Sequence, residues 1–151
     1  MTMQILLAIS VGILGIFAGT QICEGALLVP YWKSLAPKDF FELHQTYGKK
    51  IHQFFAPLTI AATLIPLLTV GVAFNHSSPR FWAILGMGVC CAAFFATYFI
   101  YFKKANQSFA NQSLSFEALP KELNRWGNWH WGRVVLEVIA FGFGLVATIT
   151  T

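Results

Sequence analysis

The chain has 151 residues, of which 56% are hydrophobic and 11% are charged, and its mean hydropathy is +0.61. Soluble domains carry about 25% charged residues, so this composition excludes an ordinary soluble globular domain. The net charge is +4, but the basic residues flank apolar runs and form no basic face, which argues against a nucleic-acid partner.

Apolar residues are gathered into four runs, at 5–29, 54–74, 81–102 and 134–149, the last preceded by more polar helical turns. About 20 apolar residues are enough for a helix to cross a bilayer. The first run lacks a basic leader and a cleavage site, so we expect it to be retained as a helix. The sequence therefore predicts an all-α fold, a polytopic four-helix bundle in the lipid bilayer that forms one domain over residues 1–151.

Capping residues and prolines suggest where these helices begin. Asp39 and Glu42 are spaced like a capping box, so the second helix is expected to begin well before the membrane. Ser78 followed by Pro79 predicts the start of the third helix after a short turn at 75–77, and Pro120 predicts the start of the fourth.

The basic residues predict the orientation of the bundle. Most of them lie in the two long connections: Lys33, Lys38, Lys49, Lys50, Lys103, Lys104, Lys121, Arg125 and nearby Arg133. By the positive-inside rule both connections face the cytoplasm, so both termini lie on the non-cytoplasmic side of a plasma or inner membrane.

This topology brings the polar ends of all four helices together on the cytoplasmic side. An ionisable residue within an apolar run is a functional hypothesis by default, because it is costly to keep there. We predict one cavity near the cytoplasmic interface, with five candidate catalytic residues: Glu24, His52, His130, Arg133 and Glu137. Trp126, His130, Arg133 and Glu137 share one stripe of the fourth helix, where Arg133 and Glu137 are spaced to pair.

The pattern Trp129-His130-x-x-Arg133-x-x-x-Glu137, together with Asn106 after the third helix, resembles the anthrone oxygenase-like family of four-helix membrane proteins. The N-x-P-x-N pattern usual at the end of the third helix in that family is reduced here to Asn106. The resemblance implies an integral membrane oxidoreductase that oxidises a polycyclic phenolic substrate with molecular oxygen, without a cofactor motif.

The residue types permit this chemistry. His130 or His52 is suited to remove a proton from carbon, and Arg133 to stabilise the resulting enolate. Glu137 would orient Arg133, and Glu24 would relay the proton or fix a histidine tautomer. A flat hydrophobic substrate would lie against the candidate substrate-binding residues Trp126, Trp129, Tyr98, Tyr101 and Asn106.

Two other interpretations use the same residues. His44, His52, His130 and Glu24 are types that bind iron, copper or zinc, and His52 with His130 could ligate haem, but no ligand spacing within one helix supports a metal site. A non-enzymatic membrane subunit or small carrier would instead use the acids and Arg133 to line a path or join helices. Gly15 and Gly19 form a small-xxx-small pair suited to close helix packing, and self-association into a homo-oligomer stays open.

Overall fold

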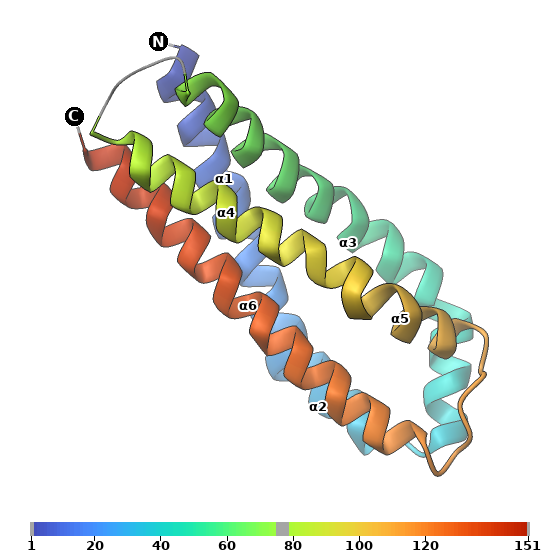
Figure 1. Cartoon of the computed structure of the whole chain (residues 1–151). Coiled ribbons are helices and arrows are strands. Elements are labelled where there is room, and N and C mark those ends of the chain that lie inside the picture. Colours follow the sequence, from blue (N-terminus) through green and yellow to red (C-terminus); the bar gives the residue numbers. More distant parts are fainter. Residues whose placement is uncertain (1, 75–78, 151) are drawn as a thin grey trace.

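The computed structural model describes residues 2–74 and 79–150, and every regular element in that part of the chain is helical (Figure 1). The elements in chain order are α1 (Thr2–Cys23), η1 (Glu24–Leu28), α2 (Val29–Ser34), α3 (Pro37–Ala73), α4 (Phe81–Thr97), η2 (Tyr98–Phe102), α5 (Lys103–Ala110) and α6 (Leu119–Ile149). The elements η1 and η2 are π-helical segments that continue the helices on either side of them.

Within the described residues, four continuous helices are long and apolar enough to cross a membrane, as predicted: Thr2–Ser34, Pro37–Ala73, Phe81–Ala110 and Leu119–Ile149. Each is longer than its apolar run because polar turns extend it beyond the region of highest hydropathy. Both chain ends lie at the same end of the bundle (Figure 1). The all-α four-helix architecture is therefore confirmed.

The helix starts agree with the sequence in part. Pro120 lies in the first turn of α6, as predicted. The second helix, α3, begins at Pro37, well before its apolar run, as predicted. The predicted capping box does not form, because Pro37 follows the extended residue Ala36 and no side chain caps the helix. The proline supplies the helical φ at that point, while Asp39 remains in the first turn. The expected turn at 75–77 and the Ser78 cap lie outside the described residues.

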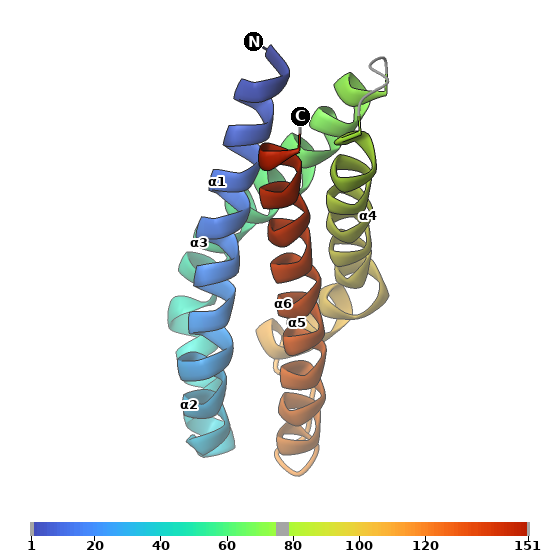
Figure 2. The same ribbon diagram turned by 90° about the vertical axis from the view of Figure 1, so that its left-hand side faces the viewer.

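The helices form a ring in which α1 packs against α3 and α6, and α4 packs against the same two helices. Figure 2 shows α6 between α1 and α4. On the α1–α6 and α4–α6 sides, Gly15 and Gly86 allow close contact with phenylalanine rings of α6. Gly19 faces open space, so only Gly15 of the expected pair contributes to packing within the chain.

Two apolar cores are separated by a polar layer. One core, around Leu14, Phe94 and Ala140, occupies the half of the bundle that contains the termini. The other, around Trp32 and Phe102, occupies the half that contains the long connections. Between them lie the buried polar residues that we call the polar layer: Gln21, Glu24, Thr97, His130, Arg133 and Glu137. Both π-helical segments begin at this level, which is notable because such segments often mark functional sites.

Candidate functional site

A cavity of about 810 Å³ opens beside the polar layer and is lined by all four long helices. This volume lies within the range usual for small-molecule sites. Its inner end is formed by Gln21, Glu24 and Arg133. Its mouth is formed by exposed polar residues of α3 and α5: Gln45, Lys49, His52, Lys103, Asn106 and Gln107. The remaining wall is mainly apolar and aromatic.

Glu24 and His130 form a pair at the inner end. The Nδ1 atom of His130 lies 3.8 Å from Oε2 of Glu24, and its Nε2 atom lies 2.9 Å from the carbonyl oxygen of Gln21. A carbonyl only accepts, so Nε2 carries a proton and donates it to Gln21. Nδ1 is then the unprotonated nitrogen of the neutral ring; it faces Glu24 at a distance too long for a hydrogen bond and has no hydrogen-bond partner among the described residues. The hydrogen bond to Gln21 fixes the histidine tautomer and leaves Nδ1 facing Glu24 as a potential proton acceptor.

The His130 ring is enclosed on every side. Its exposed fraction is 0%, and it stacks on Trp126 with ring centroids 5.1 Å apart and planes 10° apart. Trp126 is fixed in turn, because its Nε1 donates to Oδ1 of Asn106 at 2.9 Å. Gly25 permits this placement, since a Cβ atom there would lie 3.0 Å from Cδ2 of His130. His130 thus lies behind the cavity wall and supports Glu24, which does line the cavity.

Arg133 is held between two phenylalanines. Its guanidinium carbon lies 4.6 Å from the ring centroid of Phe94 and 4.5 Å from that of Phe102, an arrangement that favours a cation. Arg133 also lines the cavity.

The expected Arg133–Glu137 pair does not form as an ion pair or hydrogen bond. Glu137 is only 2% exposed, and neither of its carboxyl oxygens has a hydrogen-bond partner among the described residues. Nε of Arg133 also lacks a partner in that part of the chain. The guanidinium lies between the aromatic rings of α4 and η2 instead, so that Glu137 is left one helical turn further from the cavity.

The cavity therefore brings together only some of the predicted catalytic residues. Glu24, His52 and Arg133 line it, whereas His130 and Glu137 lie behind its wall. Glu137 points into the bundle and not toward lipid, as the cavity prediction required.

The predicted substrate-binding residues are likewise divided. Trp126, Tyr98 and Asn106 line the cavity, but Trp129 and Tyr101 do not. These two rings stack on each other, with centroids 5.1 Å and planes 10° apart. The Tyr101 hydroxyl donates to Oε1 of Glu122 at 2.7 Å. Trp129 and Tyr101 therefore join η2 to α6 outside the cavity.

The alternative metal interpretations find no assembled ligand set. No group of three His, Cys, Asp or Glu side chains that could hold a metal ion occurs within residues 2–74 and 79–150. His44 packs against Phe40 and Phe109 and directs Nδ1 to the carbonyl of Phe40. Both ring nitrogens of His130 face protein atoms, so haem ligation by His130 would require it to leave this site.

Three further lining residues, Gln21, Lys49 and Lys103, were not among the predicted site residues. In the sequence both lysines indicate orientation, and Lys49 also shares a polar stripe with Gln45 and His52; the structure places both lysines at the mouth. Gln21 lies at the inner end, buried, with its carbonyl accepting from His130. Their place on polar stripes is the only signal in the sequence, and nothing local in it marks the π-helical turns.

No protein-family model, curated protein or solved structure matches this chain. The likeness of α6 to the anthrone oxygenase pattern accordingly stays an expectation based on that motif. What the site does must be inferred from its own residues.

Proposed function

We propose that the protein is an integral membrane oxidoreductase, similar to anthrone oxygenases, that oxidises a small hydrophobic aromatic substrate with molecular oxygen. The observation that carries this proposal is the placement of the Glu24–His130 pair beside Arg133 at the inner end of a cavity of about 810 Å³. An acid–base pair and a fixed cation are what proton removal from carbon requires.

The proposed location of the site is the cytoplasmic interface of a plasma or inner membrane. The mouth of the cavity lies at the end of the bundle that contains the two lysine-rich connections. The positive-inside rule assigns these connections to the cytoplasm and both termini to the opposite side.

In the proposed reaction Glu24 removes a proton from an activated methylene carbon of the substrate. Glu24 takes this role in place of His130 because Glu24 reaches the cavity, while His130 is fully enclosed. The unprotonated Nδ1 of His130 faces the Glu24 carboxyl group at 3.8 Å, and closing this gap would let Glu24 pass the proton to His130. His52, exposed at the mouth, is placed to exchange protons with solvent.

Arg133 would stabilise the enolate oxygen that forms when the carbon loses its proton. The carbanion then gives electrons to oxygen and forms a carbon–oxygen bond, yielding a peroxide. Loss of water from the peroxide removes the second hydrogen of the methylene and breaks the O–O bond. In balance, a CH₂ group and O₂ give a carbonyl group and water.

The wall of the cavity suits a flat aromatic molecule. Trp32, Phe55, Phe95, Tyr98 and Trp126 all line it. Aromatic rings bind such substrates by offset stacking and edge contacts while excluding water from the enolate.

A direct test measures oxygen uptake and quinone absorbance with 1,8-dihydroxyanthrone as probe, using protein in phosphatidylcholine nanodiscs and subtracting the rate of empty nanodiscs. We expect Glu24→Gln to lower the protein-dependent rate by about 10²- to 10⁴-fold, as is usual for loss of a general base. Arg133→Gln should lower it as well. Glu117→Gln changes an exposed acid of the connection before α6 and should leave the rate unchanged.

Folded native protein with no rate above empty nanodiscs would contradict the proposal for this substrate class. A rate that survives in Glu24→Gln would contradict the role of Glu24. A partner protein that co-purifies in fixed ratio with an inactive native chain would instead support the interpretation as a non-enzymatic subunit.

A further inference from the structure

The lining of the cavity contains more basic than acidic side chains. Lys49, Lys103 and Arg133 line it together with His52, and Glu24 is its only acid among the described residues. One of these cations, Arg133, lies with the acid at the inner end of the cavity. Two positive charges at the mouth are therefore not compensated within the cavity.

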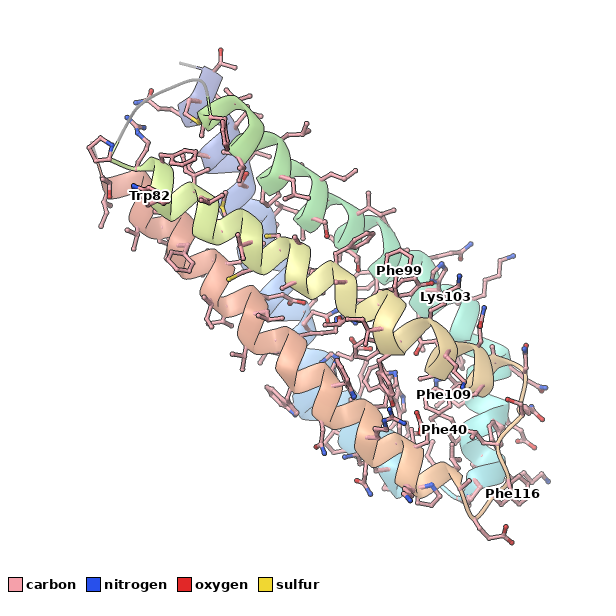
Figure 3. All side chains as sticks on the ribbon, viewed as in Figure 1. Phe40, Trp82, Phe99, Lys103, Phe109 and Phe116 are labelled. Atoms are coloured by element: carbon pink, nitrogen blue, oxygen red, sulfur yellow. The ribbon has the colours of Figure 1, made fainter. Side chains whose placement is uncertain are left out.

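Lys49 and Lys103 come from different helices, α3 and α5, that border the mouth. Figure 3 shows Lys103 on the side of its helix that faces α3. Neither lysine makes a hydrogen bond or ion pair with another residue of 2–74 or 79–150. Lysines at a membrane boundary often only extend toward lipid headgroups. Lys49 and Lys103 differ from their immediate neighbours in the sequence, Lys50 and Lys104, because these neighbours do not line the cavity. The chain thus contains matched lysines inside and outside the cavity.

The cavity also reaches the apolar surface of the bundle between α3 and η2. Ile60 and Phe99 line it and are 52% and 61% exposed. Figure 3 shows Phe99 near Lys103 on this side. Both residues lie within the apolar runs, where the surrounding medium in a membrane is the acyl region. In a bilayer, this exposed apolar lining would let a molecule dissolved in one leaflet enter the cavity sideways without crossing water.

We propose that the cavity binds an anionic amphiphile from the bilayer, with its acidic group between Lys49 and Lys103 and its apolar body directed toward Arg133 and Glu24. This rests on the proposed function and narrows its substrate to an aromatic molecule that carries a carboxylate or similar anion. The charged group of the ligand would bind at the mouth, and its apolar body would contact the wall around Phe55 and Phe95.

The test compares binding of anthracene-2-carboxylate and its methyl ester to the full chain in phosphatidylcholine nanodiscs. Binding is followed by ligand fluorescence anisotropy and by quenching of Trp32 and Trp126, which line the cavity. We expect the carboxylate to bind about tenfold more tightly than the ester, the size of effect usual for hydrogen bonds to charged groups. The Lys49→Gln/Lys103→Gln double variant should lose this preference, whereas Lys50→Gln/Lys104→Gln should retain it within about twofold.

Equal binding of acid and ester would overturn the inference, as would equal loss in both double variants, which would indicate general attraction to a basic surface. Oleate and naphthalene-2-carboxylate are then compared as competitors of bound anthracene-2-carboxylate. Equally effective competition by oleate would support an anion site and identify lipid acids as ligands. Weak competition by oleate would support the site and identify aromatic acids. Acid-selective binding without oxidation would contradict the proposed function but support the anion site. Glu24-dependent oxidation without acid selectivity would support the proposed function but contradict the anion site.

Discussion

Replacing Gly25 by alanine should disturb His130 without changing any polar group. A Cβ atom at this position would lie 3.0 Å from Cδ2 and 3.1 Å from Nε2 of His130, and 3.1 Å from Cζ2 of Trp131. Trp131 is exposed and can move away. His130 cannot move away, because its ring is hydrogen-bonded to the Gln21 carbonyl and stacked on Trp126.

The magnitude follows from two opposing contributions. Overpacking in a filled interior costs about 1–3 kcal/mol. Alanine in place of a helical glycine contributes about 0.8–1.0 kcal/mol of stability in return. We therefore expect Gly25→Ala to lower the free energy of unfolding by about 1 kcal/mol. In a His130→Ala background the clash is removed, and the same change should stabilise the protein.

The assay is unfolding in mixed micelles by increasing SDS, followed by tryptophan fluorescence, for the full double-mutant cycle. The predicted coupling between Gly25 and His130 is about 1–3 kcal/mol, well above the scatter of about 0.3–0.5 kcal/mol between independent sites. Gly19→Ala is the matched control, because Gly19 lies in the same continuous helix and a Cβ atom added there would have no neighbour within 4 Å. Additive effects of Gly25→Ala and His130→Ala would refute the close packing described here.

Three further outcomes are expected. Tyr101→Phe removes the hydroxyl that is hydrogen-bonded to Glu122 and should lower the free energy of unfolding by about 1 kcal/mol without changing ligand binding. Altered ligand binding would instead indicate that Tyr101 lines the cavity. Trp126→Phe removes the hydrogen bond to Asn106 and should lower the free energy of unfolding by about 1 kcal/mol. It should also lower the oxidation rate, and an unchanged rate would show that the reaction does not need Trp126 to hold His130 in place. In a variant whose three cysteines are alanine, Glu117→Cys should react with an impermeant maleimide only after cells are permeabilised, and reaction in intact cells would contradict the proposed orientation.

The sequence was sufficient to predict the architecture, because hydropathy and length determine which segments can cross a membrane. It was also sufficient to predict that polar residues of all four helices lie at one end of the bundle, since an up-and-down topology places alternate helix ends together. Glu24 and Glu137 are buried inside the bundle, as the cost of exposing an acid to lipid predicts for a membrane protein. These predictions depend on averages over many residues.

The finer geometry could not be predicted in the same way. A polar stripe limits a residue to one face of a helix, but it does not separate a residue that lines a cavity from one behind its wall, as with Arg133 and His130. The i, i+4 spacing permits an Arg133–Glu137 pair, yet the rings of Phe94 and Phe102, distant in sequence, attract the guanidinium instead. The π-helical turn after Cys23 shifts the facing of every later residue in that helix, and it has no local sequence signal.

The most direct test of the proposed oxygenation follows the source of the oxygen atom in the product. Native protein in nanodiscs is supplied with 1,8-dihydroxyanthrone under ¹⁸O₂, and the quinone is analysed by mass spectrometry after subtraction of product from empty nanodiscs. We predict that the protein-dependent quinone carries one ¹⁸O atom and that Glu24→Gln does not form it. Protein-dependent product with unlabelled oxygen, or equal labelled product from Glu24→Gln, would contradict oxygenation dependent on Glu24 in this cavity.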